Sequence, residues 1–204
     1  MITQEDIEKA RTPMELRQYV ALTRQKIKAD QTELSKARRK NGLYKVFVDE
    51  VMPLAQAADH LCEPEDRLKP VLGNQGYDVI ILGPTGSLKG KIEIAKPYNG
   101  KSDAIDAHLI DKQGYGQFKV HDLGAELDKV ATLILDVAKA KSLKDYSDCI
   151  LLIVGVIPPP FDCEIEGLEQ AAALLCDELK QITYIANRVV LVLPTLKKCY
   201  LIQA

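Results

Sequence analysis

The chain has 204 residues, which is typical of a single domain with a sizeable core. Apolar residues make up 47% and charged residues 27%, a balance that excludes a disordered, collagen-like or rod-like coiled-coil protein. The formal net charge of −2 excludes a chain that is basic throughout, but residues 1–45 carry 11 lysines and arginines against 6 acidic residues. The N-terminal part therefore has a charge of +5, and residues 46–204 have a charge of −7.

Neither a membrane span nor a disulfide framework is expected. The longest apolar run, residues 149–157, has nine residues, whereas a spanning helix needs about 20. The start of the chain is acidic and polar, unlike the basic start and apolar stretch of a signal peptide. The five cysteines form no Cys-x-x-Cys pair, so neither a disulfide scaffold nor a zinc knuckle is indicated. We expect a cytoplasmic protein without a membrane partner.

The first predicted element is a helix over residues 13–39. Thr12 and Glu15 fit a capping box, Pro13 suits the first helical position, and Asn41-Gly42 is a stop signal. The positive charge gathers at the end of this helix, at Lys36, Arg38, Arg39, Lys40 and Lys45. Such a cluster could track a nucleic-acid backbone, although cations at a helix C-terminus are also favoured by the helix dipole alone. We treat residues 1–42 as an N-terminal helical extension packed on the core, which could also support a homodimer.

A second helix is predicted over residues 43–60, followed by a loop over residues 62–76. Pro53 should kink this helix. Glu50 sits on the flank of its apolar stripe, where a carboxylate either reaches water or points into a polar site.

A β-hairpin comes next, with strands at residues 77–82 and 89–95. Its turn, Gly83-Pro84-Thr85-Gly86-Ser87, begins a partial match to a phosphate-binding loop. Leu88 stands where that motif needs its second glycine, and Gly90 stands where it needs Ser or Thr. Because a strand pattern follows instead of a helix, we interpret the segment as a hairpin turn and keep a degenerate P-loop as a weaker alternative.

The remaining pattern predicts alternating helices and strands. A helical turn is expected at residues 104–110 and a third strand at residues 114–120, followed by helices at 125–145 and 168–187 and strands at 149–156 and 188–193. This order favours an α/β fold with a mixed central sheet flanked by helices, in a single globular unit spanning residues 43–204.

Two carboxylates on the hairpin suggest a metal site. Asp78 opens the first strand and Glu93 lies in the second, and paired strands run about 5 Å apart, so the two could share Mg²⁺ or Mn²⁺. Such an ion can polarise a phosphodiester and activate a water molecule. In the helix at 125–145, Lys141 continues the apolar stripe and should point along the core face, where an ammonium group needs an anionic partner.

With these residues in place, the chain resembles the PD-(D/E)XK, or restriction-endonuclease-like, nuclease superfamily over about residues 43–156. The residues that carry the resemblance are Tyr77-Asp78-Val79-Ile80-Ile81-Leu82 and Lys91-Ile92-Glu93-Ile94-Ala95-Lys96, which look like the two motif strands. The resemblance implies a restriction-endonuclease-like core, with Asp78 and Glu93 as metal ligands and Glu50 as an additional acidic ligand. It also implies nucleic acid as the substrate, with DNA expected ahead of RNA.

The chain departs from the family pattern at the lysine. Ala95 occupies the position of the motif lysine, and Lys96 should face the other way. Related families supply the lysine from the following helix, which implies that Lys141 takes that role, with Lys96 as the other candidate. The resulting hypothesis is a metal-dependent nuclease. Its main alternative is a non-catalytic nucleic-acid-binding or protein-assembly module on the same fold.

Overall fold

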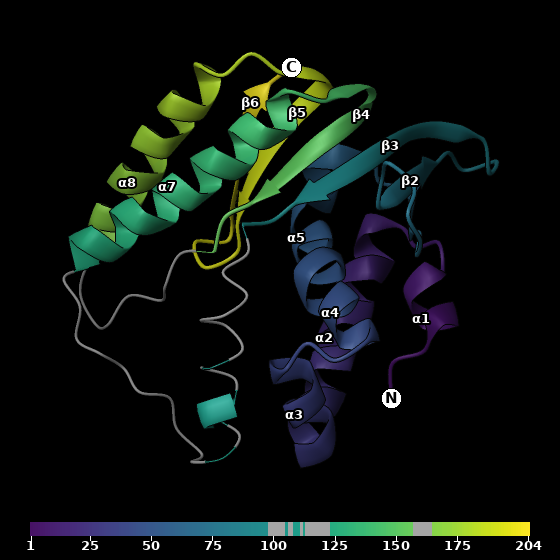
Figure 1. The fold of residues 1–204 in the computed structure, drawn as a ribbon. Coiled ribbons are helices and arrows are strands. Elements are labelled where there is room, and N and C mark those ends of the chain that lie inside the picture. Colours follow the sequence, from purple (N-terminus) through teal and green to yellow (C-terminus); the bar gives the residue numbers. More distant parts are fainter. Residues whose placement is uncertain (98–104, 106–107, 111, 113–122, 157–164) are drawn as a thin grey trace. The chain divides into compact units, whose positions relative to one another are not determined.

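The structure is a computed structural model that describes residues 1–97, 105, 108–110, 112, 123–156 and 165–204 (Figure 1). The chain divides into two compact units. Unit 1 contains Met1–Asn74 and Ile80–Leu88, and unit 2 contains Gln75–Val79, Lys89–Pro97 and the described residues from 123 onward. The predicted domain boundary after residue 42 stays a prediction.

Helical elements come first along the described chain, and strands follow, with two further helices between them. The helices are α1 (Gln4–Glu8), α2 (Pro13–Ala29), α3 (Gln31–Arg38), α4 (Leu43–Val46), the π-helix η1 (Phe47–Val51), α5 (Met52–Leu61), α7 (Leu123–Ser142) and α8 (Ile165–Lys180). The strands are β1 (Arg67–Pro70), β2 (Val79–Leu82), β3 (Leu88–Ala95), β4 (Asp145–Val154), β5 (Ile185–Leu193) and β6 (Lys198–Gln203).

The six strands form one mixed sheet in the order β1-β2-β3-β4-β5-β6. β4 pairs in parallel with both β3 and β5, and β6 is antiparallel to β5. Parallel neighbours need a crossover connection, and α8 supplies it between β4 and β5. The predicted α/β class and the mixed sheet with flanking helices are therefore confirmed.

The N-terminal helix departs from its prediction at Asp30. Thr12 and Glu15 form the expected capping box. The helix then ends at Ala29, because the Asp30 carboxylate accepts hydrogen bonds from the backbone of Thr32 and Glu33 and starts a new helix. The single predicted helix over 13–39 is thus two helices, α2 and α3.

The predicted helix over 43–60 is also interrupted. Gly42 has a φ of +56°, in the region that favours glycine, and α4 begins directly after it. A π-helical turn over Phe47–Val51 then precedes Pro53. Proline cannot donate the backbone hydrogen bond that a regular α-helix requires, so the expected irregularity appears as this wider turn.

Two strands were not predicted. β1 lies inside the segment expected to be a loop, and β6 follows the strand that was expected to close the chain. The helix α8 ends at Lys180, seven residues before its predicted end, and β5 takes up part of the difference. The hairpin turn is as expected, with Gly83 donating to the carbonyl of Ser87. The predicted strand at 114–120 lies outside the described residues. Of the helical turn predicted at 104–110, residues 105 and 108–110 are described, and they are helical as expected.

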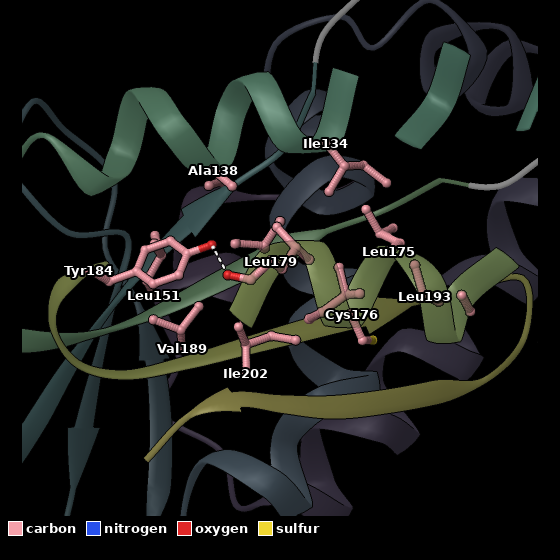
Figure 2. Packing of buried hydrophobic residues seen from close by; sticks show 14 of the residues in the cluster. Ile134, Ala138, Leu151, Leu175, Cys176, Leu179, Tyr184, Val189, Leu193 and Ile202 are labelled. Carbon is pink, nitrogen blue, oxygen red and sulfur yellow. Dashed lines mark hydrogen bonds between the residues drawn. The ribbon is translucent and has the colours of Figure 1, made fainter. Parts of the chain in front are cut away.

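The core of unit 2 lies between its helices and one face of its strands. Helices α7 and α8 cover this face, and Ile134, Ala138 and Leu179 pack against Leu151 and Val189 (Figure 2). The Tyr184 hydroxyl donates to the Leu179 carbonyl at 3.3 Å, which satisfies a polar group inside an apolar cluster (Figure 2).

Candidate functional site: a lysine–glutamate–tyrosine cluster in unit 2

Glu93 projects from β3 on the side of the sheet that α7 covers. Side chains alternate along a strand, so Glu93 shares its face with Ala95, which belongs to the α7–α8 core. On α7, Ile134 and Ala138 are fully buried, and Lys141 follows one turn later. The lysine therefore points along the core face of its helix, as its place in the apolar stripe predicts.

The Lys141 ammonium meets the Glu93 carboxylate. The distance between Lys141 Nζ and Glu93 Oε1 is 2.5 Å, and Lys141 Nζ lies 3.3 Å from the hydroxyl of Tyr146. The Tyr146 hydroxyl also donates to Glu93 Oε1 at 3.5 Å. These three residues, which we call the Glu93 cluster, come from β3, α7 and β4.

The Glu93 cluster is largely withdrawn from water. The side chains of Glu93 and Lys141 are 13% and 22% exposed. Burial lowers the pKa of Lys141, but the hydrogen bond and charge of Glu93, aided by Tyr146, outweigh it, so the pKa lies above its ordinary value. Burial raises the pKa of Tyr146, so its hydroxyl stays protonated. The cluster thus holds a fixed ammonium beside a carboxylate at the end of α7.

Asp78 lies beside β3 through a different contact. Its backbone N–H donates to the carbonyl of Ile92 at 2.9 Å, and its Oδ2 accepts from the backbone N–H of Ile94 at 2.7 Å. N–H groups of a strand point sideways toward the neighbouring strand, so the carboxylate occupies a ladder position immediately before β2 begins. It therefore lies next to the backbone of Glu93, and part of its hydrogen-bonding capacity is used by the sheet.

A second ion pair lies on β3 and β4. Lys91 Nζ is 2.6 Å from Asp148 Oδ2 and 5.2 Å from the centre of the Tyr77 ring. The Cys149 thiol donates to the other oxygen of Asp148 at 3.3 Å. The hydrogen bond and charge of Asp148 raise the pKa of Lys91, and the same contact lowers the pKa of Asp148. Burial raises the pKa of Cys149 to about 12, so this thiol is not a nucleophile.

Lys96 and Glu50 are the two other residues predicted for the metal site. Lys96 directly follows the last residue of β3 and is half-buried. Glu50 is half-buried in the π-helical turn of unit 1. The predicted roles of both residues stay predictions.

The basic cluster of unit 1 is partly neutralised within the protein. Lys36 forms an ion pair with Glu33 at 2.9 Å. Lys40, whose φ is +51°, reaches the buried carboxylate of Asp49 at 3.2 Å, and Lys45 lies 4.0 Å from the same residue. A nucleic-acid phosphate would have to compete with these carboxylates, and the interface stays a prediction.

The carboxylates of Asp78 and Glu93 offer oxygen atoms, the type of ligand that hard cations prefer. No group of three or more His, Cys, Asp or Glu side chains is placed to hold a metal among the described residues. Mg²⁺ is commonly bound by one or two carboxylates, with water and substrate phosphate completing its shell. Asp78 and Glu93 are carboxylates of the right chemistry, carried on adjacent chain segments.

The sequence alone assigned no site role to Tyr146, Lys91 or Asp148. The first four residues of β4, Asp145-Tyr146-Ser147-Asp148, were not predicted as strand because they are mostly polar. Comparisons with family models, curated proteins and solved structures found no match. None of the helices in the described part of the chain has the length and apolarity to cross a membrane.

Proposed function

We propose that the chain is a divergent metal-dependent phosphodiesterase that acts on nucleic acid, with a restriction-endonuclease-like core. The observation that carries the proposal is the contact between Lys141 on α7 and Glu93 on β3. A lysine beside the acid of the second hairpin strand is what the nuclease pattern requires, and in this chain it comes from the following helix.

In the proposed reaction, Asp78 and Glu93 would hold Mg²⁺ or Mn²⁺. The ion, when bound, would polarise the phosphodiester and activate a water molecule. Lys141 stabilises the negative charge that develops on the phosphate, because a preorganised cation in a site shielded from water acts strongly on such charge. Tyr146 holds the ammonium in place through its hydroxyl oxygen.

The test is cleavage by the purified full chain. Fluorescently labelled single-stranded DNA, double-stranded DNA and RNA are incubated with Mg²⁺, Mn²⁺ or EDTA. Glu93→Gln and Lys141→Met are each expected to reduce the rate by about 100–1,000-fold, whereas Lys96→Met should cost far less. The controls are Glu169→Gln and Lys198→Met, which remove an ion pair of the same length (2.5 Å) between α8 and β6, in a more exposed position.

Two results would contradict the proposal. One is the absence of metal-dependent cleavage on all three substrates. The other is a Glu93→Gln variant that cleaves at the wild-type rate. If Lys96→Met proves the damaging change, the lysine assignment is wrong while the phosphodiesterase proposal stands.

A non-catalytic binding or assembly module is the second candidate. It is favoured by the internal partners of the two carboxylates, because Asp78 bonds to the sheet backbone and Glu93 to Lys141. Binding of labelled DNA without cleavage, unchanged by EDTA, would support it. A nucleotide-binding P-loop is less favoured, because the strand β3 follows the turn where a phosphate loop needs a helix.

A further inference from the structure

The Lys91–Asp148 pair lies next to the Glu93 cluster on the same side of β3. Lys91 precedes Glu93 by two residues, so both side chains project from one face of the strand. In the parallel pairing with β4, Lys91 is opposite Cys149 and Glu93 is opposite Leu151. One face of β3 therefore carries a lysine at position 91 and, two residues later, Glu93 with the Lys141 ammonium beside it.

The two ion pairs differ in how easily they separate. In the Glu93 cluster both partners are mostly buried, and separating such a pair strands a charge away from water. Asp148, in contrast, is 64% exposed, while Lys91 is only 28% exposed. An exposed ion pair contributes little to stability, so Asp148 can turn into solvent at small cost.

Lys91 keeps a second contact when Asp148 leaves. Its ammonium lies over the ring of Tyr77, and a cation over an aromatic ring is attracted by the ring's electrons. The lysine is thus held in place while its counter-ion is exchangeable. This is the arrangement expected of a position that receives an anion from solution.

We propose that Lys91 is a second phosphate-binding position, which takes the phosphate next to the one bound at Lys141, and that Asp148 is the internal counter-ion that this phosphate displaces. The inference rests on the proposed function and deepens it, since it assigns two consecutive phosphodiesters of one strand to this surface. Lys91 and Glu93, the partner of Lys141, are two residues apart and therefore about 6.6 Å apart along β3. This spacing is comparable to that of successive phosphates in an extended nucleic-acid strand. Lysine suits such a position as a point charge for phosphate.

The experiment measures binding in the absence of cleavage. A fluorescein-labelled single-stranded DNA of ten nucleotides is titrated with the full chain in EDTA, at several salt concentrations. The variants are Lys91→Met and Asp148→Asn. Asparagine keeps the oxygen that accepts from Cys149 while removing the charge. Lys198→Met and Glu169→Gln serve as matched controls for an exposed ion pair elsewhere in unit 2.

The two variants should change affinity in opposite directions. Lys91→Met should weaken binding about three- to tenfold and reduce the slope of log K against log salt by about 0.7, the value for one phosphate contact of a single strand. Asp148→Asn should tighten binding about two- to fivefold, because the phosphate no longer competes with a carboxylate. The control variants should leave the affinity unchanged.

Several outcomes would overturn the inference. If both variants weaken binding, the pair is structural. If neither changes the affinity, Lys91 does not contact the strand. If inorganic phosphate binds in a Lys91-dependent way while the oligonucleotide does not, the position serves a free anion. These results are separable from the proposed cleavage: opposite shifts without cleavage retain the subsite in a binding module, whereas cleavage without the shifts removes the subsite alone.

Discussion

Replacing Lys141 by methionine tests the Glu93 cluster as a structural unit, whether or not catalysis is found. Methionine keeps an unbranched apolar side chain of similar length and removes the ammonium. The Glu93 side chain, which is 13% exposed in the wild-type structure, then loses its cationic partner. We expect the variant to fold and to have a lower free energy of unfolding than the wild type.

The expected loss can be bracketed from the exposure of the pair. Breaking a fully buried ion pair by removing one partner costs about 3–5 kcal/mol, and an exposed pair is worth about 0–1 kcal/mol. The Glu93–Lys141 pair is mostly but not fully buried, and the Tyr146 hydroxyl still donates to Glu93. A loss of about 1–3 kcal/mol follows, which for a chain of this size lowers the melting temperature by about 2–12 °C.

Urea unfolding followed by circular dichroism measures this loss. The slope of the unfolding free energy against urea should be unchanged, so that the change in midpoint reports stability alone. Lys91→Met is the internal control, because its partner Asp148 is exposed, and its midpoint should stay close to wild type. A Lys141→Met midpoint equal to that of Lys91→Met would refute the view that the cluster is a buried, mutually dependent pair.

Three further predictions concern pH, thiols and packing in unit 2. The pKa of Lys141 is raised in the folded protein, so the stability that its charge contributes should be complete below the ordinary lysine pKa of 10.5 and be lost as the pH rises through the folded pKa. In urea titrations at pH 8 to 12, the free energies of unfolding of the wild type and of Lys141→Met should therefore become equal at the highest pH. Burial raises the pKa of Cys149 to about 12 and that of Cys176 to about 11. Among the four described cysteines, iodoacetamide at pH 8 should therefore modify Cys62 and Cys199 before Cys149 and Cys176, as followed by mass spectrometry. Modification of Cys149 before Cys62 would contradict its placement. A Cβ at Gly155 would lie 2.5 Å from Leu193 Cδ2 and 2.8 Å from Ile134 Cδ1, so Gly155→Ala should lose about 1–2 kcal/mol of stability by overpacking. In the matched control Gly76→Ala, the Cβ would meet nothing within 4 Å, and the urea midpoint should not fall.

The elements with strong periodicity or specific capping residues could be predicted from the sequence. The capping box at Thr12 and the hairpin turn at residues 83–87 carry local chemistry that determines their conformation. The long apolar stripe of α7 likewise predicted a helix and the direction of Lys141. In each case, neighbouring residues are sufficient to specify the structure.

The missed elements depend on contacts distant in sequence. β1 has four residues, and Leu68 exchanges backbone hydrogen bonds with Arg11, far away in the chain. β6 has no clear alternation of apolar and polar residues. It is the last strand of the sheet and, within the described chain, pairs only with β5. The break at Asp30 was missed for another reason, since a charged residue in a polar helix is also compatible with helix continuation.

The candidate site shows the same division. The stripe on α7 was enough to direct Lys141 toward the core face, but its partner follows from the parallel pairing of β3 with β4, which no local pattern specifies. Tyr146 joins the cluster because β4 begins at Asp145, before its apolar run. The contact of Asp78 with the backbone of Ile94 could not be foreseen either, since it depends on where β2 begins relative to β3.

The double variant Lys141→Met with Glu93→Gln separates the structural role of the cluster from its proposed chemical role. Removing both charges leaves no stranded carboxylate, and a neutral pair in a mostly buried position can be as stable as the original ion pair. The double variant should therefore recover most of the stability lost in Lys141→Met, with a coupling of about 1–3 kcal/mol in the double-mutant cycle. The proposed metal-dependent cleavage needs both charges and should not recover. If stability and cleavage return together, the phosphodiesterase proposal is wrong at these residues. If stability stays low, the loss comes from packing of the lysine stem and not from the unpaired charge of Glu93.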